Sequence, residues 1–132
     1  MPIEFGAGRA GYYFDGKKED TFGNGLPDDL GIKSEADMVG LLGRGEEMFN
    51  VHCSICHGKS GNGKGVVSHH LEQVGVGVPS LHNYPQETSP DGYIYEVISN
   101  GKGLMGGYKH NLPVRDRWAI VSYLRALQAS AK

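Results

Sequence analysis

The chain has 132 residues, the length of one domain, and combines 39% hydrophobic residues with 21 glycines. A net charge of -2 and the lack of a basic tract give no electrostatic reason to expect a nucleic acid as partner. No run of about 18 apolar residues occurs, so the sequence predicts no membrane-spanning segment. Because the side chains supply only a modest apolar core, we expect a bulky apolar group to help to fill it.

Residues 1–35 are predicted to form an irregular N-terminal arm. They contain seven glycines and show neither helical spacing nor alternation of apolar residues. Several aromatic residues gather here: Phe5, Tyr12, Tyr13, Phe14 and Phe22. The arm is too rich in aromatic residues for a fully solvated tail, so we expect it to lie on a surface, either that of its own domain or that of a partner.

Residues 36–132 are predicted to form one domain that begins with two helices. The first helix is firm from Arg44 to Cys53, because glycines at positions 40, 43 and 45 weaken the pattern in its front half. The second helix has Ser89 as its N-cap and Pro90 at its first position, and it ends at Asn100 and Gly101.

The strongest helical pattern covers the last 19 residues, from Val114 onward, where apolar residues form one broad face. Long glycine-rich loops join the three helices, and the longest of them contains one short helical pattern at residues 66–74. No convincing pair of strands is present. Loops of this length are uncommon in a compact domain unless they wrap something.

Both cysteines lie in the segment CSICH, residues 53–57, which admits several interpretations. A zinc site would need two further ligands, and the histidines at positions 69, 70, 82 and 110 form no pair of the usual spacing. A redox dithiol expects a preceding strand in a βαβ unit, which is absent from the predicted elements. A disulfide is disfavoured within one helical turn, and two purely structural thiols would not require the adjacent His57.

Covalent attachment of one haem is the remaining interpretation of this segment. Cysteines three residues apart on a helical turn project their sulfurs to the same side, where Cys53 and Cys56 can bond the two vinyl groups. His57 then comes beneath the iron as the proximal ligand. The sequence therefore predicts one covalently attached haem c.

Met105 is the predicted sixth ligand of the iron. It is the only methionine well after the motif, and it lies in the glycine-rich loop Gly101–Tyr108, where missing side chains let the backbone approach a flat cofactor. Met48 precedes the motif and is assigned to the core. A histidine ligand other than His57 and an open distal face are the alternatives.

From Gly43 to Ala129 the chain resembles a class I cytochrome c. The likeness rests on the first helix GEEMFNVHCSICHG, the element Val78–Leu81, the methionine loop and the last helix RDRWAIVSYLRAL. It implies an all-α cytochrome c fold, in which three main helices and glycine-rich loops wrap one covalently bound haem. It also implies that the first and last helices cross in close contact, with Gly45 at the crossing. By the same resemblance, the backbone carbonyl of Pro79 accepts a hydrogen bond from Nδ1 of His57 and orients the ring.

Within that family, the run from Pro90 to Gln128 looks closest to the monohaem cytochrome subunit of alternative complex III, a bacterial membrane quinol-oxidising complex. The resemblance implies an electron carrier with His57 and Met105 as axial ligands, not an enzyme by itself, in a respiratory or photosynthetic chain. Its partners would be a redox donor and acceptor, including other subunits of the complex. Its location would be the periplasm or the outer face of the cytoplasmic membrane. Gly106 stands where the family often has proline, and no cysteine is available for an N-terminal lipid.

Three other functions are kept beside this one. The chain can be a free-standing soluble shuttle, or a haem enzyme or gas-binding protein with an open distal site. It can also be an interaction module with a vestigial haem, in which the N-terminal arm does the work.

Overall fold

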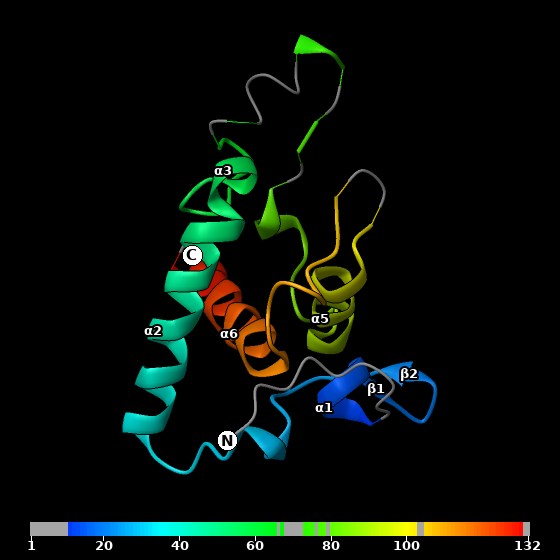
Figure 1. The fold of residues 1–132 in the computed structure, drawn as a ribbon, viewed down its shortest axis with the longest axis vertical. Helices are drawn as coiled ribbons and strands as arrows, with labels where there is room; N and C mark the ends of the chain where they lie inside the picture. The colour runs from blue at the N-terminus through cyan, green and yellow to red at the C-terminus, as the bar shows by residue number, and fades with distance from the viewer. Residues whose placement is uncertain are drawn as a thin grey trace.

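The computed structural model describes residues 11–65, 67, 73–75, 77, 78, 80–102 and 105–130, without the side chain of Ile55. The fold is mostly helical, as predicted. Its centre is α6 (Val114–Ser130), which packs against α2 (Glu35–His52) on one side and α5 (Asp91–Asn100) on the other (Figure 1). Two short elements complete this part of the chain: α3 (Ser54–His57) and the 3-10 helix η2 (Leu81–Asn83).

α2 begins at Glu35, so the prediction of a firm helix only from Arg44 was wrong for the front half. Ser34 caps the helix, because its hydroxyl accepts a hydrogen bond from the backbone N–H of Asp37 at 3.2 Å. Gly45 allows α2 and α6 to cross closely, since a Cβ on it would lie 2.1 Å from the carbonyl oxygen of Ala119. The crossing at Gly45 that the family resemblance implied is confirmed, whereas the interpretation of this glycine as a weak point of the helix was wrong.

α5 ends at Asn100, as the sequence predicted, but its N-terminus is capped differently. Its first residue is Asp91, and the side chain of Ser89 does not cap it. The backbone N–H of Asp91 donates to Oδ1 of Asn24 at 3.0 Å, and that of Gly92 donates to the carbonyl of Gly23 at 2.8 Å. A segment of the N-terminal arm thus satisfies the free N–H groups that open the helix.

The described part of the arm contains α1 (Tyr12–Asp15), a hairpin of β1 (Lys17–Lys18) and β2 (Thr21–Phe22), and the 3-10 helix η1 (Asp28–Leu30). The prediction that no strand pair exists was wrong here. Strands of two residues are too short to show alternation in the sequence, so no pattern could indicate them.

The arm packs on its own domain, beneath α5 and α6 in Figure 1. The ring of Tyr12 lies with its centroid 5.2 Å from that of Trp118, and Nε1 of Trp118 donates to the carbonyl of Tyr13 at 2.8 Å. The hydroxyl of Tyr95 donates to the carbonyl of Phe14 at 3.0 Å. The boundary between residues 35 and 36 stays a prediction. No helix in the described part of the chain is long and apolar enough to cross a membrane.

Candidate functional site

A cavity of about 330 Å³ lies between α2, α3, α5 and α6, a volume within the range of roughly 300–1,000 Å³ that is usual for cofactor sites. Most of its lining is apolar or aromatic, and the helices alone contribute Phe49, Tyr93, Ile94, Val97, Ile98, Ile120 and Leu124. Cys53, Cys56, His57 and Met105 all line this same cavity. The structure therefore brings together every described residue that the sequence assigned to haem.

The first wall of the cavity is built where α2 passes into α3. The backbone N–H of His57 donates to the carbonyl of Cys53 at 2.9 Å, so the motif forms one helical turn. The carbonyl of His57 in turn accepts from the N–H of Gly63 at 2.7 Å, which fixes the loop behind it. Both thiols and the imidazole are thus held on a short, hydrogen-bonded segment that continues a long helix.

The environment of Cys53 disfavours the redox-dithiol interpretation. Cys53 is 8% exposed, and burial, with a smaller contribution from neighbouring Cys56, raises the pKa of its thiol to about 12. A reactive dithiol requires a thiol pKa lowered toward neutrality, because the thiolate is the nucleophile. Both cysteines are free thiols in this structure, so no disulfide closes the motif.

The zinc interpretation gains no support from the described residues. Among them, no group of three His, Cys, Asp or Glu side chains is placed to hold a metal ion. A ring nitrogen of His82 lies 2.7 Å from the carbonyl oxygen of Ser60 and serves to connect two loops. His69 and His70 lie outside the described residues.

Met105 reaches the cavity from the loop that follows α5. Its backbone pairs with Lys102 in both directions, with N···O distances of 3.0 and 3.1 Å, so two limbs of the loop are hydrogen-bonded to each other here. A Cβ on Gly107 would lie 2.6 Å from the carbonyl oxygen of Ser99, and one on Gly101 would lie 2.4 Å from that of Met105. These two glycines therefore allow the two limbs of the loop to approach each other, whereas Gly106 lines the cavity.

Pro79 lies outside the described residues, so its predicted carbonyl bond to His57 stays a prediction. Its neighbours Val78 and Leu81 do line the cavity. The backbone N–H of Leu81 donates to the carbonyl of Gly61 at 2.6 Å, which attaches this segment to the loop after His57.

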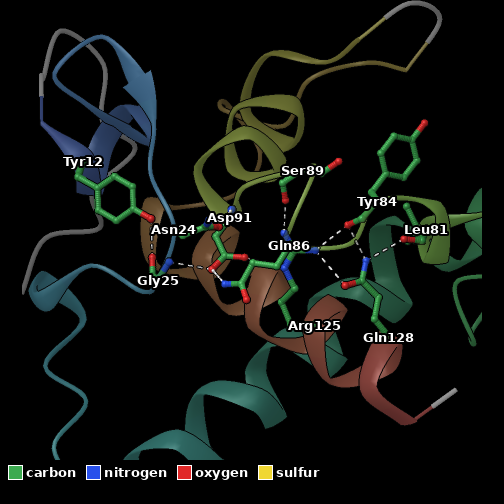
Figure 2. Close-up of polar contacts among 10 residues, drawn as sticks. All are labelled: Tyr12, Asn24, Gly25, Leu81, Tyr84, Gln86, Ser89, Asp91, Arg125 and Gln128. Carbon is green, nitrogen blue, oxygen red and sulfur yellow. Dashed lines mark hydrogen bonds and ion pairs between the residues drawn. The ribbon is translucent and has the colours of Figure 1, made fainter. Parts of the chain in front are cut away.

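Two side chains of α6, Arg125 and Gln128, hold residues 81–84 by hydrogen bonds (Figure 2). Nε2 of Gln128 donates to the carbonyls of Leu81 and Tyr84 at 2.8 and 3.0 Å. Arg125 donates to the Tyr84 carbonyl at 2.7 Å and to Oδ1 of Asp91 at 2.6 Å, and also to the carbonyl of Ser89. The guanidinium and carboxylate are 17% and 6% exposed, so this ion pair is largely shielded from water.

Sequence reasoning missed two residues that support the site. Tyr108 lines the cavity, and its hydroxyl donates to the carbonyl of His52 at 3.1 Å. Arg117 is only 2% exposed. Its position offered a signal, because Arg117 falls between Val114 and Val121 on the apolar face of the last helix, where a charge is unexpected.

These residues fit a covalently bound haem. Two thiols and an imidazole come from one helical turn, a thioether comes from a separate loop, and the remaining lining is mostly apolar. Such a lining suits a large flat macrocycle and excludes water from the ligands. The donor set of one imidazole and one thioether is suited to iron in a haem and not to zinc.

Comparisons with known proteins point in the same direction. The family described as cytochrome c oxidase, cbb3-type, subunit III matches residues 40–124. Cytochrome c-L of Methylorubrum extorquens is 27% identical over 97 residues, which are 73% of this chain and 45% of that protein. The chain thus spans less than half the length of this curated relative.

Two solved structures share the fold. Cytochrome cL from Hyphomicrobium denitrificans superposes with a TM-score of 0.51 at 25% identity, covering 95% of this chain and 73% of the other. Cytochrome cL from the marine methylotroph Methylophaga aminisulfidivorans gives a TM-score of 0.50 at 26% identity, covering 67% and 55% of the two chains.

Proposed function

Because the chain belongs to the cytochrome c family, with the cbb3-type subunit III domain and covalently bound haem c, we propose that it carries single electrons between redox partners. We further propose that Cys53 and Cys56 attach the haem, and that His57 and Met105 ligate its iron. The observation that carries this proposal is that all four side chains line one mostly apolar cavity.

The bound haem supplies one-electron exchange between ferrous and ferric iron, and methionine ligation raises its potential. If His57 and Met105 both held the iron, they would leave no position for a substrate, which favours electron carriage over catalysis. Ile94, Ile98 and Leu124 are buried and give the cavity apolar walls. The backbone pairing of Met105 with Lys102 and the helical turn at His57 hold the two ligand-bearing segments in place.

The decisive experiment compares Met105→Ala with Met48→Ala in the haem-loaded protein. Met48 is a partly buried residue that packs against the core and does not line the cavity. We expect wild type and Met48→Ala to show a low-spin spectrum and little carbon monoxide binding when reduced. Met105→Ala is expected to become high-spin or to recruit water, to bind carbon monoxide, and to show a lower midpoint potential.

Three outcomes would contradict this proposal. An unchanged spectrum in Met105→Ala would remove Met105 from the iron. Ready carbon monoxide binding by the wild type would favour the haem enzyme or gas-binding alternative. A midpoint potential outside the range of respiratory partners would favour the interaction module with a vestigial haem.

The finer placement of this carrier is also a proposal. The resemblance of residues 90–128 to the monohaem subunit of alternative complex III favours a subunit of a membrane quinol-oxidising complex. Such a subunit would lie in the periplasm or on the outer face of the cytoplasmic membrane. The relatives reported above are named as individual cytochromes, which favours a free-standing carrier as the second candidate. Fractionation of native membranes in mild detergent separates the two. A complex subunit migrates with quinol-oxidising activity at high mass, whereas a free carrier migrates alone.

A further inference from the structure

Arg117 is a buried cation whose contacts join two distant parts of the chain. It lies in the first turns of α6, and its side chain contacts residues at both ends of the loop that carries Met105. Nε donates to the carbonyl of Leu112 at 3.1 Å, and Nη1 donates to Oγ of Ser99 at 2.8 Å. The guanidinium also lies over the ring of Tyr95, 5.3 Å from its centroid.

The two acceptors lie at opposite ends of one loop. Ser99 belongs to the last turn of α5, and Leu112 comes just before α6, so the methionine loop runs between them. Backbone bonds join its limbs near the base, from the N–H of Tyr108 to Ile98 at 2.8 Å and from that of Lys109 to Ser99 at 3.0 Å. Arg117 adds a side-chain connection between Ser99 and Leu112 to these backbone bonds.

Burying the charged guanidinium of Arg117 costs desolvation free energy. Desolvation lowers the pKa of Arg117, so the surroundings disfavour its charge. A planar guanidinium can donate in two directions at fixed geometry, whereas a lysine ammonium is a compact charge on a flexible stem. Bridging two acceptors on separate limbs is a task that only the guanidinium fork performs well.

We propose that Arg117 is a positioning residue for Met105: by joining Ser99 to Leu112 it fixes the base of the loop and keeps the methionine sulfur within reach of the iron. This inference rests on the proposed ligation by Met105. It predicts that loss of the bridge lets the loop open, so that external ligands displace the sulfur more easily. The covalent attachment of the haem, which lies on another segment, is expected to stay intact.

Optical titration of the ferric haem protein with imidazole measures this opening directly. Hydrogen bonds from a charged donor are strong enough that Arg117→Gln should tighten apparent imidazole binding about 10- to 100-fold. Ser99→Ala removes one acceptor and should have a smaller effect in the same direction. Arg117→Lys should fall between wild type and Arg117→Gln, since the charge is kept but the fork is lost. Met105→Ala sets the upper limit.

Two controls separate positioning from general loss of stability. Arg115 lies two residues away on the same helix, is exposed, and donates to the carbonyl of Leu30 in the arm at 2.7 Å. Arg115→Gln should therefore change imidazole binding by no more than about twofold. Leu41→Ala empties a buried site on α2 that does not line the cavity, so it should lower unfolding stability without a comparable gain in imidazole binding.

The outcomes distinguish this inference from the proposed function. If wild type already binds imidazole as tightly as Met105→Ala, the methionine ligation itself is wrong. If wild type resists imidazole, and Arg117→Gln and Ser99→Ala resist it equally, Arg117 does not position the loop. An equal gain in Leu41→Ala would also overturn the inference, because general destabilisation would then explain it. Should Arg117→Gln fail to fold, the Ser99→Ala titration alone decides.

Discussion

The two sides of the haem cavity are built in different ways. Cys53 and His57 lie on a helical turn that continues α2, and α2 is fixed by its close crossing with α6 at Gly45. Met105 lies in a loop between α5 and α6, and its position depends on contacts made by residues elsewhere in the chain. One side is therefore secured by continuity of a helix, and the other by long-range hydrogen bonds. Substitutions on the first side should affect attachment and stability, and those on the second side should affect chiefly the ligation of the iron.

The largest effect is expected at the attachment points. Replacing both Cys53 and Cys56 by serine should abolish covalently retained haem, because serine oxygens form no thioether bond. Haem staining after denaturing electrophoresis measures this, with Ser54→Ala as the control within the same turn. Haem retained by the double variant would show that other residues attach it.

The next largest effect is expected where α6 holds the cavity wall near Leu81. Arg125→Gln should lower the free energy of unfolding by about 3 kcal/mol, because it leaves the buried Asp91 carboxylate without a cation, although Gly25 and Gln86 still donate to it. Arg44→Gln is the comparison: the carboxylate of Asp116 is nearly as buried as that of Asp91, at 9% exposure, but Arg44 itself is 47% exposed, so water reaches this pair from the arginine side. There we expect a smaller loss of about 1–2 kcal/mol. Denaturation by guanidinium chloride measures both, and equal losses would contradict the role of burial.

The third largest effect is expected at the crossing of α2 and α6. Gly45→Ala is expected to cost about 3 kcal/mol, because the added Cβ meets the backbone of Ala119 and the two helices must move apart. Gly43→Ala, on the same helix, meets no atom within 4 Å and should stabilise by about 0.5–1 kcal/mol through helix propensity. Thermal unfolding followed by circular dichroism tests the pair. The prediction fails if both substitutions shift the midpoint in the same direction.

The smallest effect is expected on the methionine side. Gly107→Ala forces the limbs of the loop apart at Ser99, and we expect roughly tenfold tighter imidazole binding with the haem still attached, equivalent to about 1.4 kcal/mol. Gly106→Ala meets no protein atom and should change binding by about twofold at most. A larger effect at Gly106 would mean that the bare backbone is needed by the cofactor and not by the loop.

Local features of the site could be predicted from the sequence, and long-range ones could not. The CSICH motif and the end of α5 are encoded within a few neighbouring residues, so their patterns are readable. Gly45 was placed at the helix crossing only by the family resemblance, because its own neighbours in the sequence do not distinguish a helix breaker from a contact point. The place of Arg117 on the apolar face of the last helix indicates burial, but its two acceptors, at the ends of a loop, could not be predicted from the sequence. The cap of α5 is a further case, since Asn24 and Asp91 are 67 residues apart.

That cap also has a consequence for the order of folding. The N–H groups that open α5 find their acceptors only after Asn24 and Gly23 return from a distant part of the chain, and closing such a loop is slow and entropically unfavourable. α5 contributes Tyr93, Ile94, Val97 and Ile98 to the cavity. We therefore expect the haem to be attached to the already formed α2–α3 segment while this wall is still open, with docking of the arm as the late step that closes the protein around it.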